Sequence, residues 1–205
     1  MTENASDGGN RRFVCVQLPW KLETVAQLAG GTTIDTLSGI TKERLRRAAN
    51  KIRDENPMFA GDLGFRVFKL ASSNINAWEP DRDSLAQSLL DSIDHLKTNR
   101  TEQDILYELL LKLGLDLCVP IDTRSIVAKD VHSIGAGTLM ACLATSIKRD
   151  EVEQLAEGLV AWHKELAPAG DVQCVFRDSA FEDDVAKSNL AAILHQHVLT
   201  NVRSL

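Results

Sequence analysis

Segment 41–53 is the most cationic part of this sequence. It contains one acid, Glu43, and six cations, Lys42, Arg44, Arg46, Arg47, Lys51 and Arg53. Arg44, Arg47 and Lys51 are spaced i, i+3 and i+7, so on a helix they share one face. Such a ridge can follow the phosphates of duplex DNA, with an attraction that weakens as salt rises. The same spacing fits the solvated face of an amphipathic helix, and both interpretations stay open.

The net charge is divided unevenly along the chain. Residues 1–70 carry 11 Lys and Arg against 8 Asp and Glu, whereas residues 71–205 carry 12 against 21. The formal charge of −6 is therefore +3 in the first third and −9 in the remainder. A surface that binds a polyanion is expected in the first third.

Cysteine and histidine offer less for chemistry. The cysteines lie far apart in the sequence and are predicted to be reduced core thiols: Cys15, Cys118, Cys142 and Cys174. His195 and His197 are two residues apart, so on a helix they point to different faces and make a poor metal pair. The other histidines are isolated, and we expect a surface position for each. The sequence therefore predicts no metal site.

The elements that must position these side chains alternate in type. β-rich runs predict strands at 12–18, 64–70, 172–176 and 201–204, and a meander over 124–143. Apolar periodicity predicts helices at 42–55, 83–97, 101–113, 149–166 and 183–197. This order indicates an α/β fold that ends in a small sheet packed by two helices. No apolar run approaches the roughly 20 residues of a membrane span.

Polar and glycine residues mark the ends of these elements. Thr41 is the expected N-cap of the first long helix, and Thr101-Glu-Gln-Asp104 forms a capping arrangement before the third. Gly114 is placed to end that third helix. Ser133-Ile-Gly-Ala-Gly-Thr138 is interpreted as a hairpin rather than a cofactor loop. Ser179 or Asp183 is expected to cap the last helix.

Five runs in order resemble the C-terminal portion of the modification (Mod) subunit of type III restriction–modification systems. These subunits are S-adenosylmethionine-dependent DNA adenine-N6 methyltransferases. The runs are Arg11-Arg-Phe-Val-Cys-Val-Gln-Leu-Pro19; Lys42-Glu-Arg-Leu-Arg-Arg47; Gly64-Phe-Arg-Val-Phe-Lys-Leu70 with Ser72-Ser-Asn-Ile75; Leu106-Tyr-Glu-Leu-Leu-Leu-Lys-Leu-Gly-Leu-Asp116; and Val175-Phe-Arg-Asp-Ser179 with Asp183-Asp-Val185. The resemblance as a whole, in family order, extends from near residue 8 to Leu205.

The resemblance implies three parts. Residues 1–78 would be the incomplete remnant of a Rossmann-like methyltransferase sheet, 79–115 a helical connector, and 116–205 a C-terminal α/β domain. At the end of the first strand Gln17 would contact the ribose of S-adenosylmethionine, with Leu18 and Pro19 forming the adjacent wall. The family continues with an acid after that proline, whereas this sequence has Trp20. The structural alternative is a buried strand in which only the end of the Gln17 side chain reaches solvent.

The catalytic motifs of the family are missing from this sequence. It contains no Asp-Pro-Pro-Tyr, and the resemblance begins after the point where the Phe-x-Gly-x-Gly loop should end. Phe59-Ala-Gly-Asp-Leu-Gly64 only approximates that loop and is interpreted as a turn. We therefore expect a C-terminal fragment without catalytic residues, inactive alone.

The resemblance also implies partners. They are duplex DNA, the remainder of the Mod polypeptide, a second Mod subunit and the helicase–nuclease restriction subunit. A cytoplasmic location is expected, because the first residues lack the apolar core of a signal peptide. Two alternatives stay open: a non-enzymatic module for Mod dimerisation or restriction-subunit binding, and a degenerate remnant without function.

Overall fold

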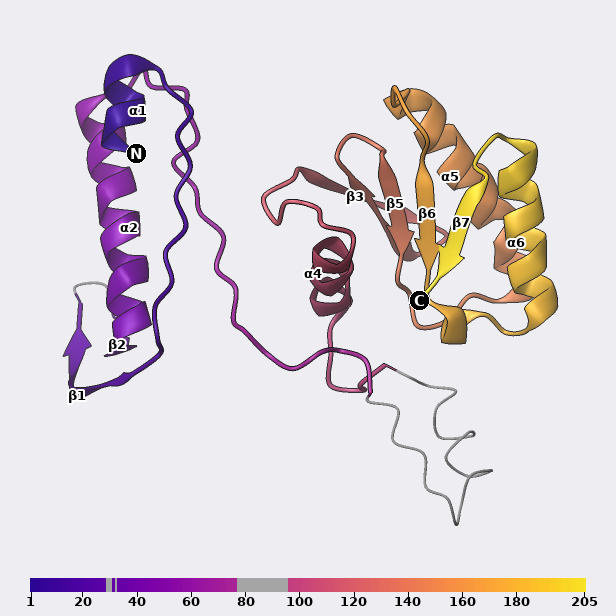
Figure 1. Ribbon diagram of the computed structural model, residues 1–205, viewed down its shortest axis with the longest axis horizontal. Helices are drawn as coiled ribbons and strands as arrows, with labels where there is room; N and C mark the ends of the chain where they lie inside the picture. Colours follow the sequence, from indigo (N-terminus) through magenta and orange to yellow (C-terminus); the bar gives the residue numbers. More distant parts are fainter. Residues whose placement is uncertain (29–30, 32, 77–95) are drawn as a thin grey trace, which may run out of the picture. The chain divides into compact units, whose positions relative to one another are not determined.

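The computed structural model describes residues 1–28, 31, 33–76 and 96–205. They form two compact units, Met1–Phe68 and Lys69–Leu205 (Figure 1). Helices and sheets occur in both units, so the expected α/β class is confirmed. None of the helices in the described part combines the length and apolar character needed to cross a membrane.

The second unit is built on a five-stranded mixed sheet. Its strands are β3 (Ile121–Ile126), β4 (Lys129–Ile134), β5 (Leu139–Cys142), β6 (Gln173–Phe176) and β7 (Asn201–Ser204), and they lie side by side in this order. The first three form the predicted antiparallel meander. The last two strands continue the sheet in parallel. Helices α5 (Val152–Leu166) and α6 (Asp184–Gln196) make this possible, because each returns the chain to the end of the sheet where the preceding strand began.

The two hairpins of the meander use left-handed backbone conformations. Val127 and Ala128 join β3 to β4 with φ of 51° and 57°, the type I′ geometry that matches strand twist. Between β4 and β5, Gly135 and Gly137 have φ of 61° and 93°. These glycines therefore form the predicted hairpin.

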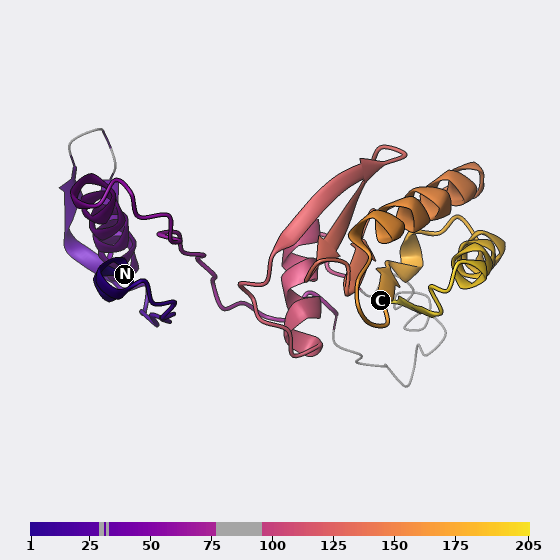
Figure 2. The same cartoon turned by 90° about the horizontal axis from the view of Figure 1, so that it is seen from above.

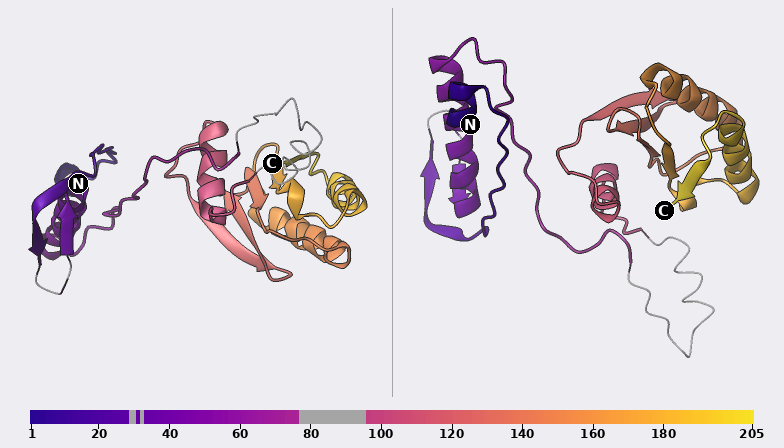
Figure 3. Two further views of the ribbon diagram at one scale, coloured as in Figure 1. Left: turned by 90° about the horizontal axis from the view of Figure 1, so that it is seen from below. Right: turned by 45° about the horizontal axis from the view of Figure 1, so that its top comes forward.

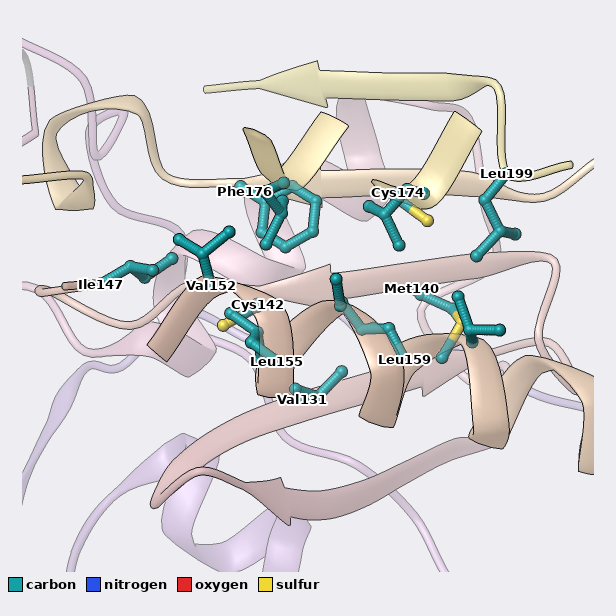
Figure 4. Close-up of a cluster of buried hydrophobic side chains, with 14 of the residues drawn as sticks. Val131, Met140, Cys142, Ile147, Val152, Leu155, Leu159, Cys174, Phe176 and Leu199 are labelled. Carbon is teal, nitrogen blue, oxygen red and sulfur yellow. The ribbon is translucent and has the colours of Figure 1, made fainter. Parts of the chain in front are cut away.

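One face of the sheet is closed by α5 and α6. On α5, Val152, Leu155 and Leu159 recur at helical spacing and pack against Val131 and Cys142 of the sheet (Figure 4). All four residues of β5 are buried, which is what a central strand covered on both faces requires. A fully buried strand of this kind reads as a continuous apolar run, and Leu139-Met-Ala-Cys142 is one.

The opposite face is covered by α4 (Glu102–Lys112), as Figure 2 shows. The helix begins with the predicted capping box, in which Thr101 Oγ1 accepts from the Asp104 backbone and Asp104 accepts from the Thr101 backbone. It ends before Gly114, whose φ of 69° is the left-handed conformation that glycine adopts freely. Ile105, Leu106 and Leu110 face the sheet.

Hydrogen bonds from Ser73 and Asn74 attach this part of the chain to α4. Glu108 accepts 2.6 Å hydrogen bonds from the Ser73 hydroxyl and the Asn74 backbone, and the Asn74 amide donates to the Asp104 carbonyl at 2.8 Å. Burial opposes ionisation of Glu108, but these donors and Lys112 lower its pKa on balance. The run Ser72–Ile75 is therefore structural in this unit.

The first unit is a hairpin and a long helix. After α1 (Thr2–Asp7), strands β1 (Lys21–Gln27) and β2 (Thr33–Thr36) pair antiparallel, and α2 (Leu37–Glu55) follows directly. Figure 3 shows the hairpin beside α2, where Ile34 is buried. Parallel strands define a Rossmann-like sheet, so this unit does not confirm the expected remnant.

Two predicted strands are wrong. Segments 12–18 and 64–70 are extended, but the structure assigns neither to a strand, and every residue from 11 to 20 is exposed. A strand needs a neighbour to bond its backbone, and the hairpin of this unit pairs with itself.

Other predictions are corrected or left open. The N-cap of α2 is Thr36, not Thr41, because Thr36 Oγ1 accepts from the Gly39 backbone at 3.2 Å and the helix starts five residues earlier than expected. Cys142 and Cys174 are buried, whereas Cys15 and Cys118 are exposed. The helix predicted at 83–97 lies almost wholly outside the described residues. Those at 101–113, 149–166 and 183–197 and the strands at 172–176 and 201–204 are confirmed.

Two neighbouring leucines of α4 test this packing. Leu110 is 0% exposed and Leu111 is 62% exposed. We expect Leu110→Ala to lower the free energy of unfolding by about 2–5 kcal/mol, because it removes buried methyl groups and leaves a cavity. Leu111→Ala, on the same helix, should change it by less than about 0.5 kcal/mol. Urea denaturation measures both, and equal effects would contradict this packing of α4.

Candidate functional site

The predicted DNA-facing ridge lies on α2 and is open to solvent. Arg44, Arg47 and Lys51 are all exposed. The helix places them on one face because it continues unbroken from Leu37 to Glu55, without proline or glycine after Gly39. The structure therefore brings the three cations together as the spacing predicted.

Intrahelical ion pairs occupy two of these three cations. Arg47 Nε donates to Glu43 Oε1 at 2.8 Å, and Lys51 Nζ lies 3.6 Å from Glu55 Oε1. Arg44 has no ion-pair partner among the described residues. Exposed pairs of this kind stabilise a protein by about 0–1 kcal/mol, so an incoming phosphate can displace either carboxylate.

The neighbouring face of α2 borders a hollow that the spacing argument missed. Its helical lining is Arg46, Ala49, Asn50 and Arg53, and its other wall is residues 63–65 and Val67. The volume is about 420 Å³. Arg46, Asn50 and Arg53 recur at i, i+4 and i+7, a signal that was visible in the sequence. What the sequence could not show is that Phe65 lies opposite them.

The predicted cofactor residues lie in the extended segment before β1. Gln17, Leu18 and Pro19 are all exposed, and the Gln17 amide donates to the Leu18 carbonyl at 3.4 Å. A side-chain amide with so weak an internal bond is free to bind ribose hydroxyls. None of these three residues lines the hollow beside α2 or the one between α5 and α6. Their role in binding S-adenosylmethionine stays a prediction.

The same segment exposes apolar side chains at alternating positions. Val14 and Val16 are 91% and 92% exposed, and Leu18 and Trp20 continue the alternation. Near the end of the unit Val67 and Phe68 are also exposed. A group of large apolar side chains in water is typical of a surface that another polypeptide covers.

In the second unit the acidic run after β6 is a helix cap. Asp183 Oδ1 accepts from the Ala186 backbone at 2.8 Å, and its other oxygen pairs with Arg149. The backbone bond and Arg149 hold the pKa of Asp183 below its ordinary value. Lys187 pairs with Asp178 from the adjoining turn. These contacts confirm the expected strand-to-helix turn, and Asp183 is the residue that caps it.

His132 lies inside the second unit, contrary to the surface position expected of it. It is 7% exposed, and its Nδ1 lies 2.9 Å from Thr123 Oγ1 on the neighbouring strand. Its Nε2 has no hydrogen-bond partner among the described residues. The register of β3 and β4 places it there, because His132 pairs directly with Thr123. No group of metal-binding side chains occurs in the described part of the chain.

Fold and site together define an α/β protein with one closed unit and one unit that exposes strand-forming apolar segments and a cationic helix. Over 74 residues the chain is 40% identical to the Mod subunit of the type III restriction-modification enzyme StyLTI of Salmonella typhimurium (strain LT2). The match covers 35% of this chain and 11% of that subunit's length. No protein-family model matches the chain. The match supports a relationship to the Mod subunits of these DNA-modifying systems.

The buried histidine gives a pH prediction. Burial lowers the pKa of His132, against the opposing charges of Glu102 and Asp130, so the folded chain prefers the neutral imidazole. In the unfolded chain this histidine binds a proton near pH 6.5. The stability that the neutral His132 contributes is therefore full above this pH, and it is lost as the pH falls from there through the pKa of the folded state. Urea unfolding at descending pH should show this loss in the wild type. His132→Asn should make the free energy of unfolding less dependent on pH. An identical pH dependence in both proteins would contradict the prediction.

Proposed function

We propose that this chain is the C-terminal part of a Mod subunit, a DNA adenine-N6 methyltransferase of a type III restriction–modification system. It is inactive alone and works after joining the remainder of the Mod polypeptide. The identity to the StyLTI Mod subunit supports this assignment at the level of the family. The division that the resemblance implies assigns residues 1–78 to the methyltransferase core, 79–115 to a connector and 116–205 to the C-terminal domain. Within it, Ser73, Asn74 and helix α4 pack on the second unit.

The observation that carries this proposal is the exposure of apolar side chains at alternating positions in segment 12–20. Val14 and Val16 expose more than nine-tenths of their surface, in a run whose pattern is that of a buried strand. Burying an aliphatic side chain of this size stabilises a protein by about 1.5–3 kcal/mol. A complementary polypeptide that pairs with this segment would supply that burial.

Pairing would also complete the cofactor site. The end of a strand in a nucleotide-binding sheet is where ribose is held, and Gln17 carries an amide that can both donate and accept. Leu18 and Pro19 form one apolar wall, and the indole of Trp20 is available to stack on adenine. S-adenosylmethionine supplies the methyl group in this chemistry. The residues of this chain bind and orient it, while the groups that hold the target adenine come from the complementary polypeptide.

DNA contact is assigned to α2. Arg44, Arg47 and Lys51 form an exposed ridge in the basic third of the chain, and ridges of this kind bind phosphates without reading sequence. In this fragment alone such binding is weak and nonspecific. The assembled subunit acts on duplex DNA in the cytoplasm.

A second candidate is a non-enzymatic assembly module. The second unit has its own core on both faces of its sheet, and residues 71–205 are strongly acidic. A closed acidic domain is suited to contacts with other proteins, here a second Mod subunit or the restriction subunit. This function does not require the first unit to bind S-adenosylmethionine.

Complementation tests the proposal. The partner is the StyLTI Mod subunit truncated immediately before its matched segment, and the measurement is calorimetric titration with S-adenosylmethionine. We expect heat only when both polypeptides are present. Val14→Asp combined with Val16→Asp should weaken complex formation at least about tenfold, because both charges would be buried. Val185→Asp with Val198→Asp, two exposed valines of the second unit, is the matched control.

The outcomes separate the two candidates. A complex that binds no S-adenosylmethionine would exclude the enzyme part and favour the assembly module. Light scattering then gives the stoichiometry with the restriction subunit. A chain that is monomeric and binds neither polypeptide would exclude both.

A further inference from the structure

The hollow beside α2 has one cationic wall and one apolar wall. Arg46 and Arg53 are seven residues apart on the helix, which separates them by about 10 Å along its axis. Opposite them lie Leu63, Phe65 and Val67. At about 420 Å³ the hollow falls in the size range of small-ligand sites, roughly 300–1,000 Å³.

Both guanidinium groups of the cationic wall keep donors to spare. Arg46 lies 3.8 Å from Glu43, but that carboxylate is bound more closely by Arg47 at 2.8 Å. Arg53 donates to the neutral amide oxygen of Asn50 at 3.0 Å. A guanidinium group has five donors, so neither contact saturates it. The wall is therefore able to bind anions.

The apolar wall decides which anion fits. A lone phosphate gains nothing from the ring of Phe65, whereas an unpaired nucleotide offers a phosphate for arginine and a base for an aromatic ring. Roughly 10 Å is the rise of about three nucleotides at 3.4 Å each. A base within a duplex cannot reach such a ring, because both of its faces are stacked.

We propose that this hollow binds an unpaired stretch of a DNA strand, with Arg46 and Arg53 on its phosphates and Phe65 against a base. The inference deepens the proposed function, because enzymes that modify a base take it out of the duplex and leave unpaired DNA beside it. Arg44, Arg47 and Lys51 extend the cationic surface along the helix toward flanking phosphates.

Fluorescence anisotropy of the full chain with labelled oligothymidine tests the phosphate contacts. Arg46→Gln with Arg53→Gln should make the plot of log K against log salt shallower by about 1.4, the loss of two contacts to a single strand. Far-UV circular dichroism checks that α2 is intact in this surface variant. An unchanged slope and affinity would overturn the proposal.

The aromatic contact has its own readout. Phe65→Leu should weaken oligothymidine binding about fivefold or more, while Phe65→Trp should retain it and add a fluorescence signal that oligothymidine quenches. Phe13→Leu is the matched control, because it removes an exposed ring that does not line the hollow. Equal affinity of the Phe65→Leu variant and the wild type would exclude stacking and overturn the proposal.

Competition distinguishes the class of ligand. A hairpin duplex or polyglutamate that displaces labelled oligothymidine as well as unlabelled oligothymidine does would overturn the proposal in favour of nonspecific charge. A negative result in the oligothymidine experiments would not contradict the proposed function. Complementation and S-adenosylmethionine binding depend on Val14, Val16 and Gln17, none of which lines the hollow.

Discussion

An extended backbone must find hydrogen-bond partners beside it, and the two units of this chain meet that requirement differently. In the second unit five strands pair in succession, and helices close both faces, so the central strand β5 is buried along its whole length. Its edge strand β3 exposes Asp122, Thr123, Arg124 and Ser125, polar residues that suit an open edge. In the first unit, segments 12–18 and 64–70 have strand composition, but the structure assigns neither to a strand.

Helix α2 is formed in that same unit because a helix bonds its own backbone. Thr36 caps its start, and its cations are fixed in position by helical geometry alone. The cationic face of α2 is therefore formed by local structure alone.

The closed unit was predictable largely from local signals. Local signals include the capping box at Thr101 and Asp104, the left-handed Gly114 and the hairpin glycines. Each acts within a few residues, so each can be recognised from the sequence without knowing the fold. The meander and the helices at 149–166 and 183–197 followed from periodicity. The candidate site was only half predictable. Helical spacing placed Arg44, Arg47 and Lys51 on one face, but the hollow behind them depends on a wall nearly twenty residues away.

By itself, the sequence determined the α/β class, the position of most helices and the cationic face of α2, because all of these depend on residues close together in the chain. The tertiary structure decided which strand-like runs become strands, since pairing requires a neighbour that composition does not reveal. It also decided that His132 is buried beside Thr123, through the register of two strands, and that Phe65 lies opposite Arg46 and Arg53. Long-range contacts carry this information, and local spacing does not contain it.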